Sequence, residues 1–172
     1  ESETVTKPVK QKTQAEISIK KGGQFVDRVY QGGLFENVDK LIVPPEHTDH
    51  SFYIRYEGPG WESDLVGYRL YLDWRNAIDI FGKKTPEMVL HNIGQDGFDS
   101  YHEPANWGMD ILKVGKSLGI GSIASWTGEK AQRVSETSQI TCEITSNGPL
   151  FSSIRLIYSD WVINNNQDNL ES

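Results

Sequence analysis

The sequence contains a single cysteine, Cys142, so the chain cannot form an internal disulfide. Cys142 lies in the alternating run ITCEIT, which is typical of a strand with one buried face, and we interpret it as a small core residue. With 172 residues the chain is long enough to bury a hydrophobic core without disulfides or metal ions. Its length suggests one domain.

Positive charge is also scarce, because 17 Lys and Arg residues face 24 Asp and Glu residues, which gives a net charge of −7. Basic residues form no block, which argues against a protein that binds nucleic acid. An anionic ligand would need a local group of basic residues, because the overall field repels it. No apolar run is long enough to span a membrane.

The two ends of the chain have little apolar character. Residues 1–14 are polar, start with Glu and include a proline, so we expect a flexible N-terminal segment without a signal peptide. We take this as the mature start of a periplasmic or extracellular protein, with a lipid anchor as one option. Residues 15–163 are expected to form a β-sandwich domain or a portion of a larger one, and 164–172 is expected to be a polar tail.

Long amphipathic helices are missing, and the short apolar runs alternate with period two between glycines and prolines. A turn at Asn147-Gly148 predicts that the last two of these runs form a hairpin. Only 104–113 is compatible with a short helix. The fold class is therefore all-β, an antiparallel β-sandwich. The clearest runs with strand character are 51–58, 64–74, 77–81, 88–93, 138–145 and 150–163.

The last predicted strand runs almost to the end of the chain, which leaves a sheet edge that needs a cover. We therefore expect either a further sandwich segment, as part of a larger supersandwich, or a homo-oligomer.

Motifs of classical enzyme chemistry are absent: there is no phosphate loop, nucleophile elbow, HExxH sequence or paired-cysteine metal site. The most informative segment is SYHEPANWGMDILK, residues 100–113, where Tyr101 and His102 are adjacent. Histidine is the commonest general base near neutral pH, and a positioned tyrosine can serve as acid or base. The alternative is that both side chains only hydrogen-bond the backbone of a loop.

A second segment, 56–75, combines aromatic rings with arginines, which suits sugar rings and their carboxylates. Arg69 stands out because it lies on the strand face opposite Val66 and Leu70. The alternative is a half-buried strand with core aromatics and solvated arginines. The residues concerned are Trp61, Tyr68, Tyr71, Trp74, Arg55, Arg69 and Arg75.

A third set of residues could in principle bind a divalent metal, but its spacing matches no compact site. We therefore expect no metal and no other cofactor, and we interpret the carboxylates as turn caps. The set is His91, Asp96, Asp99, His102, Glu103 and Asp110.

Three stretches resemble the bacterial family known as domain of unknown function four-eight-six-one. The first is a Trp-Glu-Ser-Asp strand that ends in Arg-x-Tyr, at Trp61–Tyr71. The second is a Tyr-His loop that leads into Asp-x-x-Lys-Val-Gly-x-Ser-Leu-Gly, at Tyr101–Gly119. The third is a Gly-Pro turn before an Arg-bearing strand, at Gly148–Trp161.

The resemblance implies a large β-sandwich from genes for polysaccharide breakdown. One branch, in marine bacteria, is an ulvan oligosaccharide dehydratase, which removes water across C4–C5 of a saturated uronic acid at the non-reducing end. The sequence is similar to that branch in Gly-Trp-Glu-Ser-Asp and Asp-Trp-Arg-Asn. It is shorter than family members, so part of the sandwich and of the active site could lie outside these residues.

The resemblance and the chemistry of the residues together assign roles. His102 acts as base with Tyr101 as acid, or the reverse, because the C5 proton must leave and O4 must be protonated. Arg69 clamps the uronate carboxylate, and Lys113 holds a sulfate or carboxylate on the next sugar. The other expected contacts to the acidic oligosaccharide are Trp61 and Trp107, which stack on sugar rings, together with Tyr71 and Arg75.

Two other functions remain open at this point. A polysaccharide lyase or hydrolase would act on internal bonds, and a hydrolase needs two carboxylates about 5–10 Å apart. Glu62, Asp64, Glu103 and Asp110 could supply such a pair. A non-catalytic carbohydrate-binding module would use the aromatic rings and arginines but would not need His102.

Overall fold

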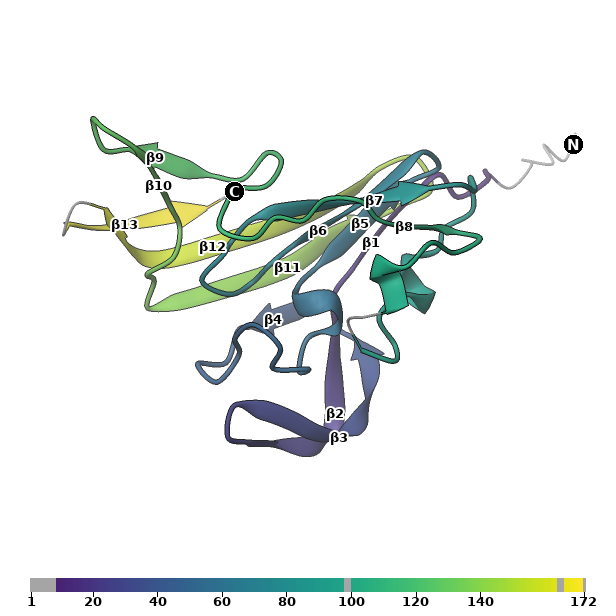
Figure 1. The fold of residues 1–172 in the computed structure, drawn as a ribbon, viewed down its shortest axis with the longest axis horizontal. Helices are drawn as coiled ribbons and strands as arrows, with labels where there is room; N and C mark the ends of the chain where they lie inside the picture. The colour runs from purple at the N-terminus through teal and green to yellow at the C-terminus, as the bar shows by residue number, and fades with distance from the viewer. Residues whose placement is uncertain (1–8, 98–99, 164–165, 172) are drawn as a thin grey trace, which may run out of the picture.

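Two antiparallel sheets face each other in the computed structural model, which describes residues 9–97, 100–163 and 166–171 (Figure 1). The first sheet has the order β1 (Thr13–Glu16), β5 (Gly60–Ser63), β6 (Val66–Leu70), β7 (Ile78–Lys83) and β8 (Gly108–Asp110). The second has the order β13 (Asn166–Glu171), β12 (Ser152–Ile163), β11 (Gln139–Asn147) and β4 (Lys40–Ile42).

Two hairpins and three short 3₁₀ turns complete the structure. The hairpins are β2 (Ser18–Val26) with β3 (Val29–Asn37), and β9 (Ala124–Trp126) with β10 (Ala131–Arg133). The turns are η1 (Arg55–Glu57), η2 (Leu90–Asn92) and η3 (Ser100–His102). The predicted all-β sandwich is confirmed. Among the described residues no helix has the length and apolar character needed to cross a membrane.

The main core lies between the sheets, because the alternation of each strand turns one set of apolar side chains inward. Leu70 of β6 and Cys142 of β11 belong to this core, and the Cys142 thiol is fully buried. Burial raises the pKa of that thiol to about 12. The expectation that Cys142 is a core residue is therefore confirmed.

A second apolar cluster covers the outer face of the first sheet. It joins Phe81 of β7 and Tyr56 of η1 to Leu90, Ile93 and Tyr101. The last three belong to the segment 84–107 between β7 and β8. The ends of this segment meet, since the backbone N–H of Lys84 donates to the carbonyl of Trp107 at 2.8 Å. Segment 84–107 therefore forms a layer over the sheet, and the candidate site lies there.

Gly108 follows the end of this segment, at a position where no side chain fits. Its φ is +137°, and a Cβ built there would lie 1.8 Å from the carbonyl oxygen of Gly82 on β7. Glycine allows both the backbone conformation and the close approach. The next two residues, Met109 and Asp110, are thereby set in register with Gly82 and Phe81.

The predicted C-terminal hairpin is confirmed, with β11 and β12 paired from Gln139↔Ser159 to Asn147↔Ser152. A bulge between Ile144 and Ser146 interrupts the register. Residues 166–171, which we expected in a polar tail, pair along β12 as β13. The β12 edge is thus covered by the chain itself.

Three local predictions are wrong. Residues 51–58 and 88–93 form turns where strands were expected. In 88–93, buried side chains satisfy the backbone groups. Arg55 Nη1 donates to the carbonyls of Leu90, His91 and Ile93 at 3.0, 2.6 and 3.3 Å. The Glu62 carboxylate accepts from the N–H groups of Val89 and Leu90. The short helix expected at 104–113 is replaced by β8.

The β2–β3 hairpin was not predicted. Its strands read SIKKGGQFV and VYQGGLFEN, and the paired glycines weaken the alternation that would reveal a strand. Asp27 and Arg28 form its two-residue turn, with φ of 48° and 68°. Left-handed residues at both positions match the twist of a tight hairpin.

Candidate active site

Arg69 of β6 lies at the centre of a buried ionic network. Its side chain is 1% exposed, and Nη2 donates to Asp79 at 2.8 Å and to Asp110 at 2.7 Å. Nη2 also contacts Tyr71 Oη at 2.5 Å, Nη1 donates to Tyr101 Oη at 2.9 Å, and Nε donates to Asp79 at 3.1 Å. These contacts hold the network together and leave Arg69 beneath the surface. They favour a positioning role over the predicted clamp on a substrate carboxylate.

The network continues to a second buried arginine, Arg75. Glu57 connects the two, 4.0 Å from Arg69 Nη1 and 2.9 Å from Arg75 Nη2. Arg75 also binds Asp73 and approaches Asp49 at 3.2 Å. The ring of Tyr71 lies under both guanidinium groups, 4.4 Å from that of Arg69 and 3.8 Å from that of Arg75. Tyr71 and Arg75, expected to contact substrate, are therefore largely buried supports.

His102 meets this network at the surface. Its side chain is 50% exposed, and Nδ1 lies 3.3 Å from Asp110 Oδ2, the same oxygen that accepts from Arg69. Asp110 comes from β8 and its carboxyl is buried, which raises its pKa to about 6 against the opposing effect of Arg69. A buried carboxylate beside an accessible imidazole fixes the ring and stabilises its protonated form.

Asp110 was not among the predicted catalytic residues, although it was considered as a metal ligand. The sequence offered one signal for a contact between Asp110 and His102: the two residues are eight positions apart in the same irregular segment. That signal is weak, because β8 and η3 are brought together only by closure of segment 84–107.

Tyr101 packs directly against His102, with ring centroids 4.7 Å apart. Burial raises the pKa of its phenol to about 12, although Arg69 acts in the opposite direction. The phenol is therefore protonated at neutral pH and can donate a proton but not accept one. Tyr101 is only 2% exposed, and its hydroxyl accepts from Arg69 Nη1 at 2.9 Å, so it belongs to the buried network. The acid and base roles of His102 and Tyr101 stay a prediction.

Two pockets flank this pair. The first, with a volume near 620 Å³, is lined by the His102–Asp110 pair, by Lys113 and by the apolar residues Met109, Ile111 and Leu112. We call it the dyad pocket. It brings together two predicted residues, His102 and Lys113, with the unpredicted Asp110. A base and a cation thus line the same cavity.

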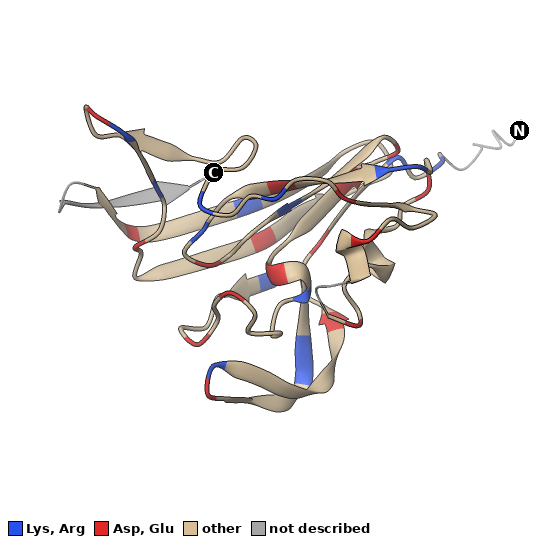
Figure 2. Cartoon of the chain, in the orientation of Figure 1, with Lys and Arg blue, Asp and Glu red and all other residues tan. Residues whose placement is uncertain are grey.

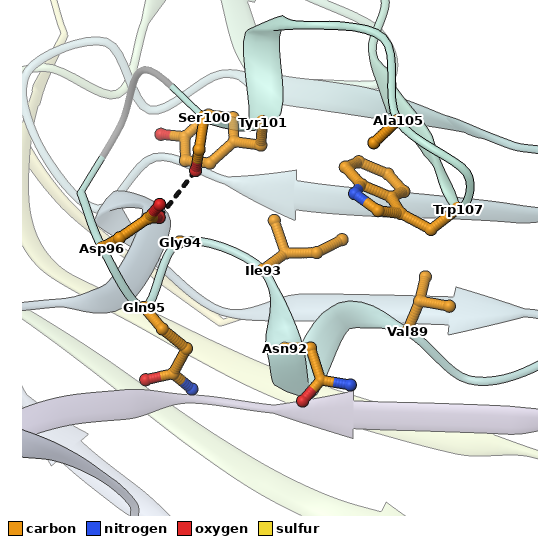
Figure 3. A pocket seen from close by; sticks show the side chains of 10 residues that line it. All are labelled: Val89, Asn92, Ile93, Gly94, Gln95, Asp96, Ser100, Tyr101, Ala105 and Trp107. Carbon is orange, nitrogen blue, oxygen red and sulfur yellow. Dashed lines mark hydrogen bonds between the residues drawn. The ribbon is translucent and has the colours of Figure 1, made fainter.

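The second pocket, near 550 Å³, is built by segment 84–107 and contains Trp107 (Figure 3). Apolar walls from Val89 and Ile93 stand beside Trp107, and Tyr101 lies on another side. Its polar groups include Asp96, which accepts from the Ser100 hydroxyl at 2.6 Å. An aromatic face surrounded by amide, hydroxyl and carboxylate groups is suited to a sugar ring. We call it the Trp107 pocket.

Trp61, the other predicted stacking residue, lies away from these pockets. It pairs in register with Tyr68, while Arg69 pairs with Gly60, so Trp61 and Arg69 point to opposite faces of the sheet. Trp61 stacks on Tyr68 at 5.6 Å and packs against the core between the sheets. The structure does not bring Trp61 together with His102.

The residues considered for a metal are mostly apart. Of the described ones, His102 and Asp110 lie together, whereas Asp96 bonds Ser100, and Asp99 lies outside the described residues. A different group, Asp49, His50 and Glu57, has ligand atoms within 4.8 Å of one another. Arg75 Nη2 already contacts Asp49 and Glu57, so an arginine supplies the positive charge at that group.

The raised pKa of Asp110 predicts a pH-dependent stability. A carboxyl whose pKa is about 6 in the folded state and near 4 when unfolded binds more protons when folded. Its contribution is therefore fully present below pH 4 and is lost as the pH rises through 6. Between pH 4 and pH 7 the unfolding free energy of the wild type should therefore fall. In Asp110→Asn this fall should be smaller, as measured by urea denaturation at a series of pH values. An unchanged slope would contradict the assignment.

The chain matches the family described as domain of unknown function (DUF4861) over residues 1–172. No curated protein and no solved structure matches it.

Proposed function

We propose that this chain, which belongs to the DUF4861 family, acts as a dehydratase on uronic-acid oligosaccharides of the ulvan type. The observation that supports this most directly is the dyad pocket, where accessible His102 contacts buried Asp110 and lies in the same cavity as Lys113. The reaction needs a base for a carbon-bound proton and a cation for the adjacent carboxylate, and this pocket contains both.

In the proposed reaction His102 removes the proton on C5 of the terminal uronate. The C4–O4 bond breaks, the C4=C5 double bond forms, and the hydroxyl leaves as water with a proton from solvent, because the Tyr101 hydroxyl is buried against Arg69. Asp110 stabilises the imidazolium that His102 becomes, and Arg69 keeps Asp110 in place. Trp107 supports a sugar ring in the neighbouring pocket.

Lys113 takes the role first given to Arg69, since the Arg69 donors are bound within the protein. The Lys113 side chain is exposed and lines the dyad pocket, so it can neutralise the uronate carboxylate. Loss of this charge near C5 would leave the carbanion-like transition state without its counterion.

The test is incubation of the purified protein with saturated uronate–rhamnose-sulfate oligosaccharides, followed by mass spectrometry. The proposal predicts loss of one water per oligosaccharide and new ultraviolet absorbance from the conjugated double bond. Shortened chains would instead indicate a lyase or hydrolase. Unchanged oligosaccharides that bind the folded protein would indicate a carbohydrate-binding module. Either result would overturn the dehydratase proposal.

Substitution of Lys113 tests how the acidic substrate is recognised. We expect Lys113→Met to reduce kcat/KM for the uronate substrate about 10- to 100-fold, because a charge-assisted contact is worth roughly 1.5–3 kcal/mol. Lys113→Arg should recover much of the loss. Lys40→Met, at an exposed position on β4, is the matched control and should behave as wild type. Equal kinetics for the two methionine variants would exclude the role of Lys113.

A further inference from the structure

Two stretches of this acidic protein are basic, residues 7–28 and residues 111–135. Residues 111–135 contain four basic side chains, Lys113, Lys116, Lys130 and Arg133, against the single acid Glu129, which gives this segment a charge of +3. Because the whole chain carries −7, the remainder carries −10. In Figure 2 blue segments mark the loop before β9 and the β9–β10 hairpin itself.

Arg133 connects the members of this segment in space. Its guanidinium donates to the carbonyl of Lys116 and, at 3.3 Å, to the carbonyl of Arg75. The same group lies over the ring of Trp74, 5.6 Å from its centroid. The hairpin is thereby fixed against the loop that carries Lys113 and Lys116.

Two tryptophans expose their rings beside these charges. Trp74 is 44% exposed and Trp126, on β9, is 70% exposed. An exposed aromatic ring next to a cation can stack on the face of a sugar ring while the cation binds a charged substituent. We call the four basic residues together with Trp74 and Trp126 the basic strip.

The three lysines of the basic strip are exposed and available to a ligand, whereas Arg133 mainly holds the strip together. Within the ranges that the structure describes, none of its four basic side chains forms an ion pair with a carboxylate. By contrast, Lys10 pairs with Glu87 at 3.0 Å and Lys21 with Glu36 at 3.1 Å. One end of the strip, Lys113, also lines the dyad pocket.

We propose that the basic strip binds the chain of an anionic polysaccharide beyond the sugars held in the dyad pocket. Lysine and arginine contact its sulfate or carboxylate groups, and the two tryptophans stack on its sugar rings. The remainder of the chain sums to −10, so the strip, whose cations form no ion pair with a described carboxylate, is a favoured place for a polyanion. This inference rests on the proposed function only for the position of the reacting sugar.

A sulfated glycan fits the strip better than a nucleic acid. Nucleic acids carry a phosphate on every nucleotide, and their binders neutralise many of them with broad basic surfaces. Here only four positive charges stand on a protein whose other residues sum to −10. A polysaccharide with a charge on alternate sugars needs fewer cations and presents ring faces to the tryptophans.

The test compares the affinities of two double variants for polymeric ulvan. Each variant removes two positive charges. Lys116→Gln with Lys130→Gln removes two exposed cations of the strip, and Arg28→Gln with Lys40→Gln removes two exposed cations elsewhere. We expect the first pair to weaken binding about tenfold at low salt. The deficit should shrink as salt rises, because screening removes the same interaction. Trp126→Ala should weaken binding at all salt concentrations.

Binding is measured on His102→Asn protein, so that the polymer is not converted during the titration. Equal affinities for the two charge pairs would overturn the proposal. Single-stranded DNA that binds as tightly as ulvan, and is lost in the same variants, would overturn it in favour of a nucleic-acid site. If the wild type dehydrates no uronate oligosaccharide, the proposed function is wrong. The proposal for the basic strip is unaffected by that result, because its test measures binding and not turnover.

Discussion

Replacement of His102 by asparagine should lower kcat for the uronate substrate by about a thousandfold. A positioned general base contributes roughly 10²- to 10⁴-fold, and asparagine cannot accept the C5 proton. Because the His102 side chain is half exposed, its removal leaves the core intact, and thermal unfolding should stay close to wild type. The rate is measured by the ultraviolet absorbance of the unsaturated product.

The matched control for this experiment is His91→Asn. His91 is exposed, lies in the same segment, and its ring forms a hydrogen bond with the neighbouring Asn92 at 2.8 Å. We expect this variant to keep wild-type turnover. If His102→Asn is as fast as His91→Asn, the dyad takes no part in the reaction.

The second large effect is expected on stability rather than on rate. Arg69→Met removes the positive charge shared by Asp79 and Asp110, both with side chains that are 1% exposed. Two buried carboxylates would then face each other without a cation, and we expect the unfolding free energy to fall by about 3–5 kcal/mol at neutral pH. The deficit should shrink as the pH falls through 6, because Asp110 then becomes neutral.

Arg155→Met is the control for this substitution. Arg155 pairs with Glu143 at 3.2 Å, but its side chain is 44% exposed, and such a surface pair is worth less than about 1 kcal/mol. Denaturation with urea at pH 7.5 and at pH 5 measures both variants. Similar losses for the two arginines, or a deficit for Arg69→Met that grows at low pH, would contradict the buried network.

The sandwich could be predicted because its longest hairpin follows simple alternation. Cys142 and Leu156 pair across β11 and β12, and both lie in runs where every second residue is apolar. Residues 51–58 have the same alternation, yet Phe52, Tyr56 and Glu57 adopt left-handed conformations there. Their backbone follows the buried contacts of Arg55, which lie 35 to 38 residues away in the sequence. Local periodicity contains no information about such partners.

The candidate site was predictable to a similar degree. The irregular segment after residue 99 was recognised by its residue types, and His102 and Lys113 do line one pocket. Arg69 was recognised as unusual, but its use depends on Asp79 and Asp110, which reach it through strand register and closure of a long segment. The separation of Trp61 from Arg69 likewise follows from the pairing of β5 with β6.

Segment 84–107 suggests how proteins of this architecture could change their ligands. Its described residues form no strand, its ends meet between β7 and β8, and it is held by Arg55 and Glu62 from outside. A different sequence joined at the same two ends would leave both sheets intact, provided those two anchors remain. Under the proposed function, replacement of this segment would change the lining of the Trp107 pocket, and with it the preferred ligand, while the scaffold stays constant.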